Sequence, residues 1–327
     1  MKKLIPIILL ISSIGIMGQT FYSTPFAHTY SIVARDPVTG DIGAGVQSHW
    51  FSVGSSVIWG EAGVGVVATQ SFVNVSFGLR ALSLLKKGLS PQEVVDELIK
   101  SDEGRDFRQL AVLDTKGKSA AYTGAKCIQP AGHITGENFS VQANLMINDK
   151  VWGAMEKAFK NSKGQLVDRI LEAMDAAQKT GGDIRGTQSA SIIVYKGTAS
   201  DKPWEDKLVD LRVEDSADPI SEMKRLVKLH HAYDHMNQGD LYVEKNEMDK
   251  AMIEYKTAEA MFPDYEEMKF WHATTLVNAN KLEEALPLFK EVFVKNKNYI
   301  ELVPRLIPSG LLVADKKTLE KILSQAK

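Results

Sequence analysis

Apolar and polar residues along the first two-thirds of the chain fall into short runs that are typical of β-strands. Residues 31–34 and 42–47 flank the turn sequence DPVTGD, in which proline presets φ and glycine accepts a positive φ. These two runs predict a β-hairpin that begins on Thr29 and Ser31. Its second strand is rich in glycine and alanine, so another element is expected to approach its backbone closely.

Other strands and helices follow in blocks. Helical spacing of apolar residues predicts one helix over residues 76–87 and another directly after the capping box that begins at Ser90. The same spacing predicts helices from Val151 to Phe159 and from Leu166 to Met174. Two strands within 55–70, a hairpin over 107–124 and strands over 140–147, 188–196 and 207–213 lie between and after the helix pairs. Strand blocks that alternate with helix pairs predict an α+β fold, a four-layer αββα sandwich over residues 29–218.

The last third of the chain, residues 219–327, is predicted to be all helical. A pattern with a period of 34 residues relates Gly239, Tyr242, Ala251, Tyr255 and Ala258 to Ala273, Leu276, Ala285, Phe289 and Val292. Small residues at helix contacts, an aromatic residue one turn later and Pro263 at the end of the first unit resemble the tetratricopeptide repeat. Because two repeat units are rarely stable as an isolated domain, this region is expected to pack against the sandwich.

The N-terminus has the layout of a secretory signal. Lys2 and Lys3 precede the apolar run 4–17, which is too short to span a bilayer, and Gly18 is a suitable residue before a cut. We therefore expect a signal peptide at residues 1–18, a leader at 19–28, no membrane span, and export to the periplasm or the medium.

Charge and residue usage exclude several functions. The net charge of -2 without a basic tract argues against nucleic-acid binding. The histidines lack zinc-ligand spacing and there is no phosphate-binding or dinucleotide-binding glycine loop, so neither a metal nor a cofactor is expected. Cys127 is the only cysteine, which rules out an intramolecular disulfide.

Polar residues interrupt the apolar strands mostly near their ends, where a cleft would lie. A single buried polar side chain usually finds a hydrogen-bond partner within the protein. So many amides and hydroxyls near strand ends must form hydrogen bonds either with one another or with a ligand. The set comprises Ser48, His49, Thr69, Gln70, Asn74, Gln142, Asn144, Arg185 and Gln188.

Several segments also carry a family resemblance. TYSIVARDPVTGDIGAGVQSHWFSVG, GVGVVATQSF, GAKCIQPAGHITGENFSVQANLM, GGDIRGTQSA and DLRVEDSADP resemble the domain-of-unknown-function 1028 family. That family is grouped with the N-terminal nucleophile (Ntn) hydrolases, which share the αββα sandwich and use the first residue of the mature domain as nucleophile and its α-amine as base.

The resemblance implies an exported amidohydrolase that acts on a small amide or peptide-like substrate. It places the nucleophile at Thr29, which requires a cut after His28, with Ser31 as the alternative hydroxyl and Ser48 and His49 beside it. It also implies an oxyanion hole at the backbone of Thr69 and Gln70. The remaining strand-end residues, Asn74, Gln142, Asn144, Arg185 and Gln188, would then bind the substrate.

Two other interpretations remain open. The third strand, SSVIWGE, lacks the lysine that many Ntn enzymes place near the nucleophile, which favours an inactive scaffold that binds a peptide or partner protein through its helical repeats. Alternatively, Cys127 could be a nucleophile with His133 as its base, on a stretch, CIQPAGHITG, that reads as a loop. Self-association into a homo-oligomer is also left open.

Overall fold

The predicted hairpin lies at the centre of a six-stranded antiparallel sheet. The computed structural model describes residues 26–27 and 29–326. Strands β2 (Thr29–Arg35) and β3 (Ile42–Ser48) pair so that Thr29 lies opposite Ser48. The sheet has the order β11-β10-β3-β2-β9-β8. Its other members are β8 (Gly132–Gly136), β9 (Phe139–Ala143), β10 (Ser189–Tyr195) and β11 (Lys207–Val213).

The second sheet packs face to face against the first. It contains β1 (Phe26–Ala27), β4 (Ile58–Glu61), β5 (Gly65–Phe72), β6 (Arg108–Asp114) and β7 (Ser119–Thr123). Strands β1 and β4 pair with opposite ends of β5, along the edge that β6 leaves free. Because β1 belongs to this sheet and β2 to the other, the chain changes sheets between Ala27 and Thr29.

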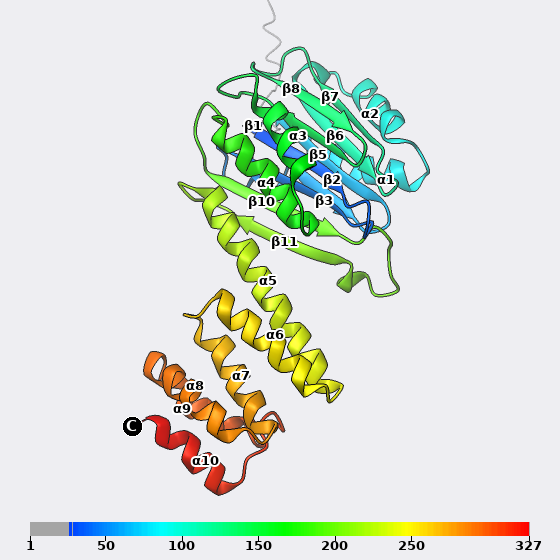
Figure 1. Ribbon diagram of the computed structural model, residues 1–327. Helices are drawn as coiled ribbons and strands as arrows, with labels where there is room; N and C mark the ends of the chain where they lie inside the picture. The colour runs from blue at the N-terminus through cyan, green and yellow to red at the C-terminus, as the bar shows by residue number, and fades with distance from the viewer. Residues whose placement is uncertain (1–25, 28, 327) are drawn as a thin grey trace, which may run out of the picture.

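Two helix pairs cover the outer faces and complete the predicted αββα sandwich (Figure 1). Helices α1 (Ser76–Lys86) and α2 (Pro91–Lys100) lie on the five-stranded sheet, and the capping box at Ser90 is formed. Helices α3 (Val151–Asn161) and α4 (Leu166–Lys179) lie on the six-stranded sheet. Separate apolar clusters fill the space between the sheets and beneath each helix pair.

Strand β3 needs its glycines because helix α4 packs closely against it. A Cβ atom on Gly45 would lie 2.4 Å from Ile170 Cγ2 and 2.6 Å from Met174 Sδ. A Cβ on Gly43 would lie 2.8 Å from Ile170 Cδ1. Real Cβ atoms do not approach carbon or sulfur this closely. Helix α4 can therefore pack on the sheet at this distance because Gly43 and Gly45 have no side chains.

Two local expectations differ from the structure. The strand predicted over residues 140–147 ends at Ala143, because Leu145 takes a left-handed φ of 57° and turns the chain. The stretch read as a loop around His133 instead forms β8, an edge strand whose residues alternate between partly covered and exposed. Alternation in so short a segment, flanked by glycines, gave too weak a pattern to be seen.

The C-terminal third is helical, as predicted, and extends away from the sandwich (Figure 1). Helix α5 (Pro219–Glu244) starts against the sandwich core through Ile220, Met223 and Val227, and its second half packs on α6 (Met248–Met261). Gly239 allows this contact, since a Cβ there would lie 2.7 Å from the Tyr255 ring. The array continues through α7 (Glu266–Asn278), α8 (Leu282–Lys295), α9 (Asn298–Leu306) and α10 (Lys316–Leu323).

Some expectations concern residues that the structure does not describe. The signal peptide at residues 1–18 lies outside the described residues, as does the leader at 19–28 apart from the backbone of residues 26–27. The domain boundary after residue 218 stays a prediction. Among the described residues, no helix is both long enough and apolar enough to cross a membrane.

Candidate active site between the two sheets

Thr29 lies at the first position of β2, between the two sheets, and its side chain is fully buried. Its hydroxyl Oγ1 has no hydrogen-bond partner among the described residues. Its carbonyl oxygen, in contrast, accepts hydrogen bonds from the backbone N–H of Asn144 at 3.1 Å, from Gln70 Nε2 at 3.1 Å and from Asn144 Nδ2 at 3.4 Å. A firmly held backbone with an unpaired buried hydroxyl is unusual, because buried polar groups are normally satisfied.

Ser31, the alternative hydroxyl, is fully engaged. Its Oγ donates to Gln70 Oε1 at 2.6 Å and accepts from Gln142 Nε2 at 2.6 Å. Gln142 Oε1 in turn accepts from Ser140 Oγ at 3.0 Å. The strand alternation explains this placement, because Thr29 and Ser31 face the opposite sheet while Tyr30 faces α4 and bonds Gln178. The Ser31 hydroxyl therefore acts as a link in a network rather than as a free nucleophile.

Gln109, on β6, joins the two sheets at the centre of this network and was missed in the sequence. Its Oε1 accepts from Gln70 Nε2 at 2.6 Å and from Asn144 Nδ2 at 2.9 Å. Its Nε2 lies within bonding distance of Thr123 Oγ1 at 2.8 Å and the Ala143 carbonyl at 3.0 Å. A single glutamine in the apolar run RQLAVLD was the available signal, since it shares a strand face with Ala111 and Leu113 between the sheets.

The network reaches the surface at His133 rather than at Cys127. His133 Nδ1 lies 2.8 Å from Thr123 Oγ1, and burial lowers the pKa of its imidazole. Cys127 is buried, its Sγ donates to the Arg108 carbonyl at 3.3 Å, and burial raises the pKa of its thiol. These different partners and the raised thiol pKa leave the cysteine without the features of an activated nucleophile.

Ser48 ends the neighbouring strand β3 and His49 follows it, next to a buried carboxylate. The His49 backbone N–H donates to Asp183 Oδ2 at 3.3 Å, and Arg185 holds the same carboxylate in a bidentate pair at 3.0 and 2.6 Å. Gln188 bonds Asp215 instead, at 3.2 Å. Arg185 and the His49 backbone thus share the Asp183 carboxylate beside the Thr29 end of the hairpin, whereas the Gln188 side chain bonds Asp215.

Thr69 and Asn74 lie on the other side of β5. Neighbouring residues of a strand face opposite sides, so Gln70 points between the sheets and Thr69 points toward the helix layer, where its Oγ1 donates to the Asn74 carbonyl. The Thr69 backbone N–H is also committed, to the Val57 carbonyl at 2.9 Å. The oxyanion hole expected at this amide is therefore not available in the described structure.

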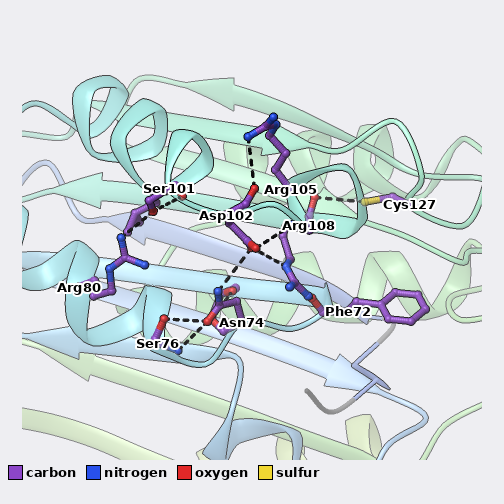
Figure 2. A network of polar contacts seen from close by, with 12 residues as sticks. Phe72, Asn74, Ser76, Arg80, Ser101, Asp102, Arg105, Arg108 and Cys127 are labelled. Carbon is purple, nitrogen blue, oxygen red and sulfur yellow. Dashed lines mark hydrogen bonds and ion pairs between the residues drawn. The ribbon is translucent and has the colours of Figure 1, made fainter. Parts of the chain in front are cut away.

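Asn74 belongs to a separate ionic network at the start of α1 (Figure 2). Arg108 donates from Nε to Asp102 Oδ2 at 2.7 Å and from Nη1 to the Phe72 carbonyl at 2.5 Å. Asn74 Nδ2 also donates to Asp102 Oδ2, at 3.4 Å. Burial alone would raise the pKa of the Asp102 carboxyl, but the hydrogen bonds from Arg108 and from the Gly104 amide outweigh it and hold that pKa low. This network fixes the end of β5 on which β1 pairs.

The described part of strand β1 is short. It pairs with β5 at Phe26–Phe72 and Ala27–Ser71. Ser71 takes a left-handed φ of 72° there, and Leu145 takes 57° next to Asn144. A left-handed φ is costly for side chains of this kind, and such backbone strain tends to gather at functional sites.

The chemistry that this arrangement offers is that of hydroxyls and amides. The hydrogen-bonding side chains of the network are neutral, apart from the titratable His133 at its outer end. Among the described residues, no group of three or more His, Cys, Asp or Glu side chains could hold a metal ion. Acyl transfer to a hydroxyl suits such a set, because it needs a nucleophile, a base and hydrogen-bond donors.

Comparison with known proteins supports the fold and the family. Among solved structures, 32 chains match this one. They include the crystal structure of protein SPO2555 from Silicibacter pomeroyi, which carries the DUF1028 family model; it shares 31% identity with a TM-score of 0.57 over 62% of this chain and 85% of that one. Anbu (ancestral beta-subunit) from Yersinia bercovieri also matches, with 13% identity and a TM-score of 0.30 over 60% of this chain and 92% of that one. No curated protein matches. The model of a family of unknown function, DUF1028, matches residues 29–223, and the chain therefore belongs to the DUF1028 family.

Proposed function

We propose that the protein is an exported amidohydrolase of the N-terminal nucleophile type, with Thr29 as its nucleophile once the leader has been removed. The observation that carries the proposal is the buried Thr29 Oγ1, which has no hydrogen-bond partner among the described residues while its backbone carbonyl is held by three donors. The start of the family match at residue 29 supports the same position. The substrate class is a small amide or peptide-like compound, and the site of action is the periplasm or the medium.

The reaction follows from the groups at Thr29. Its Oγ1 attacks the amide carbonyl carbon, and the free α-amine accepts the hydroxyl proton. When the tetrahedral intermediate collapses, the carbon–nitrogen bond breaks and the amine passes the proton to the departing nitrogen. Water then attacks the ester on Thr29, again with the amine as base, and releases the acid product and the free hydroxyl.

The surroundings of Thr29 suit an amine base without a nearby lysine. An α-amine has a pKa of about 7.7–8.0 in solution, close enough to neutrality to accept a proton. In a buried site where the neutral amides of Gln70 and Asn144 hold the Thr29 carbonyl, loss of hydration disfavours the charged form of the amine. Desolvation thus lowers the amine pKa, a task that a nearby lysine would otherwise perform by repulsion. Gln70 and Asn144 act as positioning residues, because they hold the Thr29 backbone.

Covalent trapping tests the proposal. The full chain is produced with its signal in an exporting bacterium, purified and treated with a β-lactone, a strained ester that acylates reactive hydroxyls. The expected result is one added acyl group, mapped to Thr29 by peptide mass spectrometry, and none in Thr29→Ala. Ser31→Ala is the matched control and should still be labelled. Labelling that is unchanged in Thr29→Ala, or absent from a protein shown to start at Thr29, would contradict the mechanism.

A second function, binding of a peptide or partner protein by tetratricopeptide-like repeats, is favoured by a groove on the helical region. The groove has a volume of about 370 Å³ between α7 and α8 and includes Lys269, Glu291 and the exposed Val294. Its mixture of apolar and charged groups suits a peptide. If peptide binding is independent of Thr29, the Thr29→Ala protein should still capture a partner that the Val294→Glu protein no longer captures. Equal capture by the parent protein and both variants would argue against binding in the groove.

A further inference from the structure

A large cavity lies at the end of the sandwich opposite Thr29, where α5 leaves the sandwich. It has a volume of about 650 Å³ and is bounded by the β2–β3 turn, the start of α4, β10, β11 and α5. That volume is within the range of sites for small organic molecules. Thr29 starts β2 and Asp36 directly follows the end of that strand at Arg35, so the cavity and the candidate active site are separated by the length of the strand.

The floor of the cavity is apolar. Leu166, Val167, Val194 and Val209 are buried members of the core cluster beneath α3 and α4, and each of them also lines the cavity. Leu208 extends the apolar surface toward the rim, with 38% of its surface exposed. An occupant must therefore present an apolar body to these side chains.

The rim is acidic, and none of the described residues that line the cavity is a lysine or an arginine. Asp36, Asp41 and Asp234 contribute carboxylates from the β2–β3 turn and from α5. Asp36 is compensated by Arg169 at 3.5 Å, outside the cavity lining, and by the backbone N–H groups of Val38 and Thr39. Asp234 lies 3.4 Å from His230, which is a counter-charge only when it is protonated.

Asp41 is the carboxylate with the least compensation. Its Oδ2 accepts a hydrogen bond from Thr39 Oγ1 at 2.8 Å, and it forms no ion pair with another described residue. Asp41 lines the cavity from the β2–β3 turn, whereas Asp234 lines it from α5. Two carboxylates above an apolar floor, with His230 beside Asp234 and no lysine or arginine among the described lining residues, make an environment that attracts a cation and repels an anion.

We propose that this cavity is a binding site for an organic cation, a primary ammonium group on an apolar body. The ammonium group binds between Asp41 and Asp234, and the alkyl portion covers Leu166, Val167 and Val209. A ligand in this place contacts the sandwich and α5 together, and its binding is independent of the hydrolytic function proposed for Thr29. A free aliphatic amine and the side chain of a lysine in a peptide share this chemistry.

The test is a titration of the full chain, with isotope-labelled Leu and Val methyl groups, followed by NMR at pH 7. Hexylamine is the probe, and hexanol and hexanoate are controls with the same apolar body but no charge or a negative charge. Saturable shifts of the Val167, Leu208 and Val209 methyl signals are expected with hexylamine, weaker ones with hexanol and none with hexanoate. Equal binding of hexanol and hexylamine, or no binding of the amine, would overturn the proposal.

Charge-neutralising variants sharpen the result. Asp41→Asn and Asp234→Asn keep the side-chain shape and should each weaken hexylamine binding by about fivefold, the effect expected for a partly exposed ion pair. Asp149→Asn, an exposed carboxylate before α3 at the Thr29 end, is the matched control and should leave the affinity unchanged. Thr29→Ala should also bind normally, which separates this site from the active site. Unchanged affinity in both cavity variants would refute the role of charge.

Nα-acetyl-lysine methylamide distinguishes the two sources of the cation. If it binds at least as tightly as hexylamine, the site takes a lysine side chain of a peptide; if only hexylamine binds, it takes a free amine. Either result supports a cation site, whereas binding of the Nε-acetylated form with equal affinity would contradict it, because that compound carries no charge.

Discussion

The substitution Gln109→Leu is the strongest test of the hydrogen-bond network between the two sheets. Gln109 accepts from Gln70 and Asn144 and has three hydrogen-bond acceptors around its Nε2. Leucine has a similar volume but no polar atom, so the change leaves buried groups short of partners without creating a large cavity. Leaving a buried polar group unsatisfied costs about 1–3 kcal/mol. Because Gln70 and Asn144 keep their bonds to the Thr29 carbonyl, we expect a total loss of about 2–4 kcal/mol of unfolding free energy.

Urea denaturation followed by circular dichroism measures this loss as a lower transition midpoint with an unchanged slope. Gln92→Leu is the matched control, since Gln92 is exposed on α2 and should change stability by less than about 0.5 kcal/mol. Substitution of Gln70 by leucine in the same chain should cost less than the sum of the two single changes, because the partners are removed together. A Gln109→Leu protein as stable as the parent would refute the claim that this network holds the sheets together at Thr29.

Three further outcomes follow from packing and charge. Gly45→Val should destabilise the fold by about 1–3 kcal/mol through overpacking against α4, whereas Gly153→Ala, which has open space around it, should be neutral or stabilising in thermal unfolding. His231 Nε2 donates a hydrogen bond to the Asp168 carboxylate, which raises the pKa of the His231 imidazole above its ordinary value. The contribution of this pair to stability is therefore complete at low pH and is lost as the pH rises through the raised pKa, and this pH dependence should disappear in His231→Gln. Cys127 should resist maleimide at pH 7 in the folded protein and react in urea, and rapid labelling of the folded form would restore it as a candidate nucleophile.

Much of the fold could be predicted because its signals are local. The turn between β2 and β3, the capping box at Ser90 and the apolar spacing of α4 each depend on residues that are close in sequence. The close approach of another element to β3 could also be predicted, since glycines within a strand indicate it, but the identity of α4 as that element could not. Strand β8 was missed because an edge strand of five residues between glycines has little periodicity.

The candidate site could be predicted only in part, because its contacts are distant in sequence. The polar residues at strand ends were visible, and the structure joins Thr29, Ser31, Gln70 and Asn144 with Gln142 in one network. The sequence does not specify which sheet faces which, so a lone glutamine in an apolar run could not by itself place Gln109 between the sheets. The same limit applies to Thr69: strand alternation puts Thr69 and Gln70 on opposite faces of β5, but only the packing of the two sheets shows which face lies between them.

The N-terminus that the protein has after expression in an exporting bacterium tests the central claim most directly. The full chain is secreted from an exporting bacterium, and the intact mass and the N-terminal peptide are measured by mass spectrometry. The account predicts a species that starts at Thr29, with a free α-amine beside the unpaired Oγ1. A single species that starts at Gln19, with Thr29 still in an internal peptide bond, would leave the hydroxyl without its base and contradict the proposed mechanism.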